Sequence, residues 1–508
     1  MSCVRTKIPG PPGTGKTHHL INKYLIKEIE ENKIDSKKIA YITFTNAGTE
    51  EAQKRIKLLF PGKEFPYICT MHSFGVKELC LDTSKQLLKD EKWNGFKNFS
   101  SICQHLNFDH EYDPELGYVV HKNDYMNIIE YARAKKINVN EANIELNLSD
   151  INVSLLEQIN ADLISYKAQT NMIEYSDMIK LFIEKDKCPP MDVVFLDEAQ
   201  DLNPMQWDMF FYIESKCKRS YVAGDDDQTI YTFQGAEPSI FINLKGIVDP
   251  KIESRRVPKL IYNKSLEILN NIHTRLNKEW KPKEAQGNIF ENQLLSNLDF
   301  SKGEWMILAR TNNMLTPIRQ YISDLGIRFD SKNNDLLSND ILKAYRVWQR
   351  LNQGATVSGE EAKCIYEVLN CDKKHVKRGF AKGQSLENVK LVDIDDLMMN
   401  HGLMITGDWE QLDIVEETKL FMKSLLKSGD DLMQNARIKV STIHSVKGQE
   451  CDNVVLFPDL GRTVYNAALN NPDPEHRLFF VGVTRTKENL HLMEPTNDYY
   501  YTIGEPIL

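Results

Sequence analysis

The sequence predicts an α/β protein with two parallel-sheet lobes, each interrupted by a mainly helical insertion. Three observations lead to this prediction. Short apolar strands alternate with helical segments near both ends of the chain, a pattern typical of parallel sheets with crossover helices. Two long stretches, 82–170 and 331–435, break the alternation and have helical character. A glycine-rich turn lies between the first strand and the first helix.

The elements follow from local patterns. Residues 16–31 place apolar side chains at helical spacing, and 125–134 form the clearest amphipathic helix of the first insertion. Strands are expected at 39–44, 193–197, 220–223, 305–309, 439–443, 453–457 and 489–493. The predicted domains are lobe 1A (1–81 and 171–262), insertion 1B (82–170), lobe 2A (263–330 and 436–508) and insertion 2B (331–435).

Composition limits the class of protein. The 508 residues are 41% hydrophobic and 27% charged, which is typical of a soluble globular chain, and no apolar run is long enough for a membrane helix. No signal segment begins the sequence, so a cytoplasmic location is expected. Nine cysteines without a C-x-x-C pair favour neither a disulfide framework nor a zinc module. The net charge of −9 means that any nucleic-acid binding must use local grooves.

The glycine-rich turn GPPGTGKT (10–17) fits the phosphate-loop pattern G-x-x-x-x-G-K-[ST]. Glycines let backbone N–H groups approach phosphate, and the following helix adds a positive N-terminal dipole. Lys16 is expected to reach the β- and γ-phosphates, and Thr17 is expected to hold Mg²⁺. A chance glycine-rich turn is the structural alternative, but the helix that the motif requires follows it. The predicted cradle comprises Gly10, Gly13, Thr14, Gly15, Lys16 and Thr17.

A second signal is VVFLDEAQD (193–201), where a buried strand ends in two acids. The carboxyl end of a strand is where an open parallel sheet binds its ligand. Asp197 is expected to bind Mg²⁺, and Glu198 to polarise the attacking water as a general base. An acidic helix cap is the structural alternative for these acids alone. Together with the phosphate loop, they indicate an ATPase.

Six further segments occur in order and resemble motifs of the UvrD/Rep-type superfamily 1A DNA helicases. They are FTNA (44–47), TMHSF (70–74), AGDDDQTIYTFQGA (223–236), SRRVP (254–258), VSTIHSVKGQE (440–450) and FVGVTRT (480–486). With the two ATPase motifs they cover nearly the whole chain. The resemblance implies two RecA-like P-loop NTPase lobes that bind ATP between them, with single-stranded DNA crossing both.

The resemblance also implies roles for residues around the nucleotide. Gln228 would contact the γ-phosphate or its water and couple nucleotide state to DNA. Arg256 and Arg485 would act as arginine fingers on the transferring phosphoryl group. Arg255 stands where the family has Tyr, and its guanidinium plane would stack on adenine. Gly448 and Glu450 would lie beside the ribose.

For DNA, the resemblance implies aromatic stacking and contacts to the sugar-phosphate backbone. Phe44, Tyr231 and Phe233 would stack on bases, with Phe233 in place of the family's usual Trp. Core packing is the alternative for these rings, and a capped helix start or a buried histidine is the alternative for the backbone contacts. The implied backbone contacts are Thr45, Asn46, Thr70, His72, Arg310, Asn312, Thr442 and His444.

The expected function is therefore an ATP- and Mg²⁺-dependent DNA helicase that moves 3′ to 5′ on single-stranded DNA, with the duplex junction and replication or repair proteins as partners and a monomer as the active form. An RNA helicase of the same superfamily and a non-processive nucleic-acid-binding ATPase switch remain alternatives. Only nine residues precede Gly10, so the upstream segment in which the family reads adenine is not expected here, and base discrimination should be weak.

Overall fold

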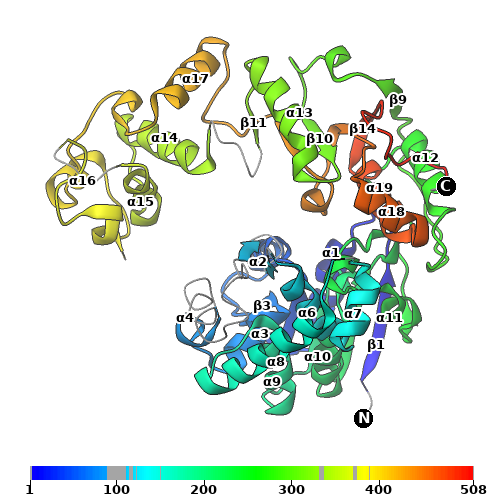
Figure 1. Ribbon diagram of the computed structural model, residues 1–508. Helices are drawn as coiled ribbons and strands as arrows, with labels where there is room; N and C mark the ends of the chain where they lie inside the picture. Colours follow the sequence, from blue (N-terminus) through cyan, green and yellow to red (C-terminus); the bar gives the residue numbers. More distant parts are fainter. Residues whose placement is uncertain are drawn as a thin grey trace.

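Two six-stranded parallel sheets form the framework of the protein, one in each lobe (Figure 1). The computed structural model describes residues 3–88, 110–113, 118–121, 123–148, 150–330, 337–369, 374–387 and 389–506. The α/β fold with two parallel-sheet lobes is as predicted. All seven predicted strands and the helices at 16–31 and 125–134 are confirmed, with boundaries that agree to within three residues.

The sheet of lobe 1A has the order β3-β2-β6-β7-β1-β8. Its strands are β1 (Val4–Pro9), β2 (Ile39–Thr43), β3 (Tyr67–Thr70), β6 (Val193–Leu196), β7 (Arg219–Gly224) and β8 (Ile247–Val248). Successive side chains of β6 pack into two different cores: Val193 and Phe195 into one, Val194 and Leu196 into the other. Both faces of the sheet are covered, which explains why β6 is apolar throughout and β2 nearly so.

Helices cover the two faces of this sheet. On one side α1 (Lys16–His19) continues as wider helical turns, η1 (Leu20–Leu25) and η2 (Lys27–Glu31), and packs beside α2 (Asn46–Leu59). On the other side lie α3 (Met71–Glu78), α9 (Tyr175–Glu184), α10 (Pro204–Ser215) and α11 (Pro238–Asn243). The short helices η5 (Ala199–Asp201), η6 (Asp226–Gln228) and η7 (Thr232–Gln234) follow the carboxyl ends of strands β6 and β7.

The sheet of lobe 2A has the order β11-β12-β10-β13-β14-β9. Its strands are β9 (Asn288–Gln293), β10 (Trp305–Ala309), β11 (Phe329–Asp330), β12 (Ile438–Thr442), β13 (Cys451–Leu456) and β14 (Thr486–Met493). Helix α13 (Asn312–Asp324) covers one face, and α12 (Lys259–Leu269), α18 (Arg462–Asn470) and α19 (Asp473–Val483) lie at the other. Helix α12, which spans the boundary predicted at 262, shares a core with α19.

The two insertions have cores of their own. Insertion 1B contains α4 (Thr83–Gln86), α6 (Asp124–Lys135), α7 (Val139–Leu146) and α8 (Val153–Thr170). It also contains an antiparallel pair, β4 (His110–Asp113) and β5 (Tyr118–His121), which the helical interpretation of 82–170 did not anticipate. Insertion 2B contains α14 (Asn339–Asn352), α15 (Gly359–Glu367), η9 (Ala381–Leu386), α16 (Ile394–Asn400), η10 (Trp409–Gln411) and α17 (Glu416–Lys427).

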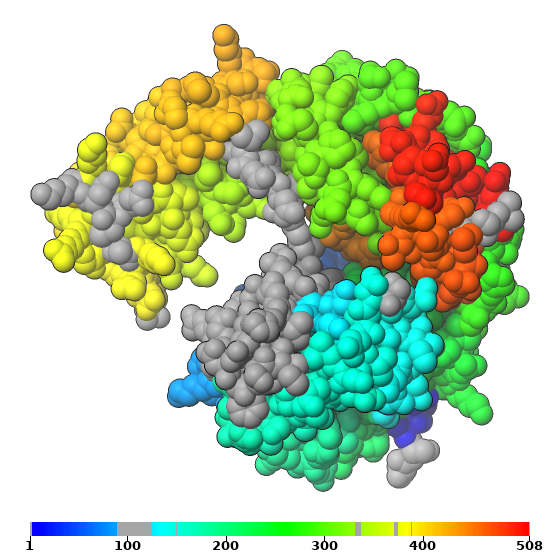
Figure 2. Space-filling model, viewed as in Figure 1, coloured from blue at the N-terminus to red at the C-terminus, as the bar shows by residue number. Residues whose placement is uncertain are grey.

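Insertion 2B stands away from the lobes. In Figure 1 helices α14 to α17 form a separate body at the upper left, joined to lobe 2A near β11. Figure 2 shows a wide opening beside this body (yellow and orange), next to its junction with lobe 2A (green). Within the described ranges, no helix is both long and apolar enough to cross a membrane.

Candidate active site and nucleic-acid interface

The phosphate loop joins β1 to α1 and lines a cavity of about 590 Å³ between the lobes. Gly13 has a φ of +73°, which an L-residue adopts only with strain. A Cβ at Gly13 would also lie 2.5 Å from Cβ of Arg256 and 2.6 Å from Oγ of Ser254. The loop is therefore packed directly against the SRRVP segment. The Lys16 ammonium donates to the Gly10 carbonyl oxygen at 2.9 Å, within the loop that would cradle phosphate.

The close packing at Gly13 leads to a prediction that uses Gly62 as the control. Both residues have positive φ, but nothing lies within 4 Å of a Cβ at Gly62. Gly62→Ala should cost about 1 kcal/mol of stability from backbone strain. Gly13→Ala should cost about 1–3 kcal/mol more through overpacking, and it should weaken nucleotide binding. Chemical denaturation and titration with a fluorescent nucleotide measure both effects. Equal losses in the two variants would contradict the packing described here.

Asp197 and Thr17 meet at the carboxyl end of β6. The Thr17 hydroxyl donates to Asp197 Oδ2 at 2.6 Å, and the Tyr41 hydroxyl donates to the same oxygen at 3.1 Å. Burial, together with the neighbouring Glu198, raises the pKa of the Asp197 carboxyl to about 6. A buried carboxylate beside a hydroxyl offers the oxygen ligands that Mg²⁺ takes in phosphate sites. These two side chains therefore fit the predicted metal site.

Glu198 lies at the same edge in a strained conformation, with a φ of +55°. Burial alone would raise the pKa of its carboxyl, but Lys16 and Lys447 together with a hydrogen bond from Gln200 lower it below the usual value. The group is therefore ionised at neutral pH, as a general base must be. Gln200 is completely buried and donates to Glu198 Oε2 at 2.6 Å, while its own Oε1 accepts from the Asp225 N–H at 2.8 Å.

Two guanidinium groups face the same cavity from different segments. Arg485 is 1% exposed, and its Nη2 donates to Gln228 Oε1 at 3.0 Å. Arg256 donates to Glu450 at 2.5 Å. Burial lowers the pKa of Arg485 far below its usual value, because little water is present to stabilise the charge. Repulsion by the neighbouring Arg256 guanidinium lowers the pKa further. An anion between the two side chains would relieve this repulsion.

The strand-end turns of the two lobes repeat one geometry. Thr70 ends β3, and its hydroxyl lies 3.0 Å from that of Ser73. Thr442 ends β12, and its hydroxyl lies 3.0 Å from that of Ser445. Each threonine oxygen also accepts the N–H of its serine partner. The histidines at the centres of these turns, His72 and His444, have pKa values lowered to about 4 and about 3, mainly by burial. They are neutral at pH 7 and can hydrogen-bond to a DNA backbone without attracting it as cations.

A group of aromatic rings lies between these two turns. The Phe44 and Tyr231 rings are 5.1 Å apart, and the Phe233 ring meets His444 edge-on at 5.5 Å. Phe233 is 50% exposed, whereas Tyr231 is 2% exposed and has the Lys447 ammonium over its ring. Phe233 therefore offers a free stacking face. The Tyr231 ring is buried beside the nucleotide cavity, and its contact with DNA stays a prediction.

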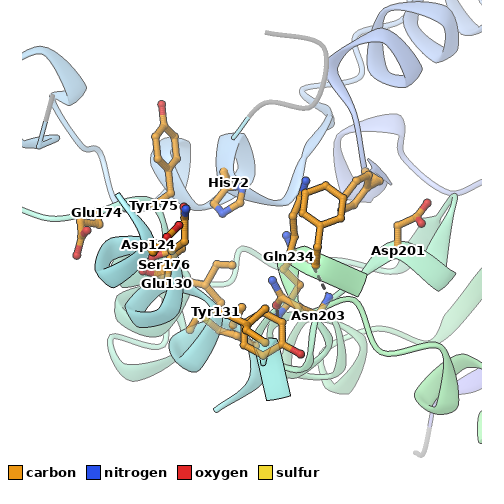
Figure 3. A pocket seen from close by; sticks show the side chains of 18 of the residues that line it. His72, Asp124, Glu130, Tyr131, Glu174, Tyr175, Ser176, Asp201, Asn203 and Gln234 are labelled. Atoms are coloured by element: carbon orange, nitrogen blue, oxygen red, sulfur yellow. Dashed lines mark hydrogen bonds between the residues drawn. The ribbon is translucent and has the colours of Figure 1, made fainter. Parts of the chain in front are cut away.

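A second cavity of about 340 Å³ opens beside this group, between lobe 1A and insertion 1B (Figure 3). Figure 3 shows His72 and Tyr175 on one side of it and Tyr131 and Asn203 on the other. The side-chain amide nitrogen of Gln234 is buried here without a hydrogen-bond partner among the described residues. Phe44 and Asp201 line both cavities, so the nucleotide side and the aromatic side share a wall.

Comparison with known proteins identifies the family. Residues 4–248 match the UvrD/REP helicase N-terminal domain, and residues 438–493 match the UvrD-like helicase C-terminal domain. The chain belongs to the UvrD/REP family of ATP-dependent DNA helicases. Several relatives align with nearly all of this helicase, among them the following two. The probable DNA helicase II homolog of Mycoplasma genitalium is 23% identical over 94% of this chain and 81% of its own. The Gabija protein GajB of Bacillus cereus is 22% identical over 96% of this chain and 92% of its own.

Other matches are shorter or more distant. The ATP-dependent DNA helicase Rep of Buchnera aphidicola is 25% identical over 51% of this chain and 42% of its own. A solved PRRSV helicase aligns with 97% of this chain and 53% of its own, at 9% identity and a TM-score of 0.35. The family assignment of this helicase therefore depends on the sequence matches.

Most of the expected nucleotide residues of this helicase line one cavity. Gly10 and Arg255 are the exceptions, since neither is part of the lining. The backbone N–H of Arg255 donates to the Gly13 carbonyl at 2.9 Å, but its side chain is exposed. The lining residues of the expected set are Gly13, Thr14, Gly15, Lys16, Thr17, Asp197, Glu198, Gln228, Arg256, Gly448, Glu450 and Arg485.

The remaining expected DNA residues of the helicase have structural partners. Thr45 caps α2 by accepting the Gly48 N–H at 3.0 Å, and Asn46 begins that helix. Arg310 makes two hydrogen bonds to Glu475, at 2.8 and 2.9 Å. Asn312 begins α13, and its side chain accepts a hydrogen bond from Arg319. A DNA phosphate would have to compete with Glu475 for the Arg310 guanidinium.

Two residues near the cavity, Lys447 and Gln200, lie in the sequence motifs but had no predicted role. Lys447 of lobe 2A forms an ion pair with Asp201 and donates to the Gln228 carbonyl oxygen at 2.5 Å. Gln200 connects Glu198 to Asp225, as described above. Both residues lie within recognised motifs, so the sequence indicated that they are near the site. Their partners could not be predicted, because the fold alone brings them together.

Proposed function

We propose that this helicase uses Mg²⁺-dependent ATP hydrolysis between its lobes to move 3′ to 5′ along single-stranded DNA and to separate strands at a duplex junction. The observation that carries the proposal is the composition of the 590 Å³ cavity. Lobe 1A contributes Lys16 and Glu198, lobe 2A contributes Arg485, and Gln228 lies between them in hydrogen-bond contact with Arg485. A triphosphate there would bind both lobes at once.

The hydrolytic roles follow from charge and position. Lys16 would leave the Gly10 carbonyl to bind the β- and γ-phosphates. Glu198 would accept the proton of the attacking water, and Gln200 would hold that carboxylate in place. Arg256 and Arg485 would stabilise the charge that develops on the transferring phosphoryl group. Thr17 and Asp197 would hold Mg²⁺, which supplies charge neutralisation between the β- and γ-phosphates.

Movement along DNA would depend on the repeated turns. The Thr70–Ser73 turn belongs to lobe 1A, and the Thr442–Ser445 turn belongs to lobe 2A. Closure of the lobes on ATP would shorten the distance between these two turns, and opening of the lobes after hydrolysis would restore that distance. Phe233 follows Gln228 by five residues in the sequence and its ring meets His444 of the second turn, so it would offer bases a stacking face beside that turn. The 3′ to 5′ polarity is proposed from the likeness of the DDDQ segment (225–228) to the family motif.

Stimulation of the ATPase tests the nucleic-acid class. We expect single-stranded DNA oligonucleotides to raise ATP turnover well above the rate without nucleic acid, and RNA of the same sequence to do so less. Stronger stimulation by RNA would support the RNA-helicase alternative. If neither polymer stimulates hydrolysis, the proposed coupling of ATP hydrolysis to nucleic-acid binding is wrong.

Phe233→Ala should lower DNA affinity by about 1–3 kcal/mol, because it removes an exposed stacking face. Hydrolysis at saturating DNA should persist, since no nucleotide contact is removed, but fewer base pairs should be opened per ATP. Phe290→Ala is the matched control, because Phe290 is also exposed, at 41%, but lies on β9 against His491. DNA affinity, melting temperature and unwinding should be measured on both variants. A large fall in melting temperature with unchanged DNA affinity in Phe233→Ala would assign the ring to core packing.

A further inference from the structure

Three consecutive carboxylates are buried next to the nucleotide cavity. Asp225, Asp226 and Asp227 are at most 2% exposed. Burial of an ion is unfavourable unless opposite charges and hydrogen bonds compensate it. The compensation comes from a segment outside every recognised motif, the connection between α12 and β9. Lys278 places its ammonium within 2.9 Å of an oxygen of each carboxylate, and Arg275 makes two hydrogen bonds to Asp227, at 2.8 and 2.7 Å.

Lys278 is well suited to this position. Its side chain is 4% exposed. Burial alone would lower the pKa of the ammonium, but the three carboxylates raise it above the usual value, so Lys278 remains charged at neutral pH. Its three N–H donors sit on one nitrogen atom, so they can serve three acids that converge on a single point.

The connection that carries Lys278 is attached to lobe 2A. Trp280 packs edge-on against Phe480 of α19, with ring centres 5.7 Å apart. At the other end, Asp473 of α19 accepts the backbone N–H groups of His273 and Thr274 at 2.9 and 3.1 Å. The connection therefore moves with α19, the helix that precedes Arg485. The three acids, in contrast, follow β7 of lobe 1A.

A continuous chain of contacts leads from Lys278 to the nucleotide cavity. Lys278 donates to Asp225 Oδ1, while Asp225 Oδ2 accepts from the Gln228 side-chain amide at 2.6 Å. The other end of that amide, Oε1, accepts from Arg485 at 3.0 Å. Gln228 is thus held from both sides by residues of lobe 2A, directly through Arg485 and indirectly through Lys278.

We propose that Lys278 is a positioning residue for ATP hydrolysis: it binds the three acids of lobe 1A to lobe 2A and, through Asp225, holds the Gln228 amide at the nucleotide cavity. The inference rests on the proposed function, which places Gln228 at the γ-phosphate. A change in the distance between the lobes would then be passed to Gln228 through Asp225. No contact of Lys278 with ATP or DNA is required.

Two variants and a control test the role. Lys278→Met removes the ammonium and leaves Arg275 as the remaining cation on the three acids, so stability should fall as well as activity. Adding Asp226→Asn restores the original net charge of the cluster without restoring the contact to Asp225. Lys281→Met is the control, because Lys281 lies in the same connection but is 55% exposed and pairs only with Glu279 among the described residues. Melting temperature, fluorescent-nucleotide affinity and DNA-stimulated ATPase should be measured on all three and on Asp226→Asn alone.

We expect the double variant to regain most of the melting temperature lost in Lys278→Met, while its DNA-stimulated kcat stays about 100-fold below that of the native protein and its nucleotide affinity is nearly unchanged. Lys281→Met should stay within about twofold of the native rate. Recovery of both stability and kcat in the double variant would overturn the proposal, because Lys278 would then serve only to balance charge. The proposal would also be overturned if the double variant failed to fold while Asp226→Asn alone folded. A native protein without ATPase activity would instead overturn the proposed function.

Discussion

Glu198→Gln should reduce ATP turnover by about 100- to 10,000-fold while nucleotide binding is retained. The substitution keeps the shape of the side chain, and its amide oxygen can still accept the 2.6 Å hydrogen bond from Gln200. An amide cannot accept the proton of the attacking water, however, so the chemical step should fail. Lys16, Thr17 and Asp197 remain in place to hold the triphosphate and Mg²⁺.

The measurement is a single-turnover hydrolysis assay together with fluorescent-nucleotide titration. Glu64→Gln serves as a control, because Glu64 is an exposed acid paired with Lys37 on the surface of lobe 1A. A Glu198→Gln protein with native turnover would show that another group activates the water. Loss of nucleotide binding in this variant would show instead that Glu198 maintains the shape of the site.

Arg485→Lys should lower kcat by about 1,000-fold, although the positive charge is retained. The guanidinium makes four hydrogen bonds: to Gln228 Oε1 at 3.0 Å, to the Val481 carbonyl at 3.0 Å, to the Gln449 carbonyl at 3.2 Å and to the Thr484 hydroxyl at 3.4 Å. A lysine ammonium on a flexible stem cannot make these bonds and bridge phosphate oxygens in one fixed geometry. The connection between lobe 2A and Gln228 should therefore be lost together with transition-state stabilisation.

Arg437→Lys is the matched control for this variant. Arg437 also donates to a backbone carbonyl, that of Gly303 at 2.7 Å, but it lies away from the nucleotide cavity. Turnover of Arg437→Lys should be close to native, and both variants should bind nucleotide. Equal rates for Arg485→Lys and the native protein would show that Arg485 does not contribute to catalysis as proposed.

The strands that sequence predicted and those it missed differ in position within the sheets. The interior strands β2, β6 and β10 are apolar, or nearly so, on both faces, so a local pattern was sufficient there. The missed strands β3, β8, β9 and β11 are at or near sheet edges and are short or exposed. β1 was recognised despite its polarity, and the structure explains that polarity: Lys7 donates to the Ile242 carbonyl at 2.9 Å, and Arg5 pairs with Glu214.

The site could be predicted as a set of motifs but not as a network. The phosphate loop and the DEAQD segment each specify their chemistry through residues close together in sequence. The pairs that join the lobes involve residues far apart: Lys447 with Asp201, and Arg485 with Gln228, are separated by 246 and 257 positions. Tyr231 and Phe233 show a related limit. The turn at η7 directs one ring inward and the next outward, which the motif alone does not specify.

Unwinding of tailed duplexes tests the central claim most directly. Three substrates with the same duplex should be compared under single-turnover conditions with ATP and Mg²⁺: one with a 3′ single-stranded tail, one with a 5′ tail and one blunt. We expect strand separation of the 3′-tailed duplex, little of the other two, and none with Glu198→Gln. Preferred unwinding of the 5′-tailed duplex would contradict the proposed polarity. ATP hydrolysis stimulated by single-stranded DNA without unwinding of any substrate would contradict the claim that this chain couples hydrolysis to strand separation.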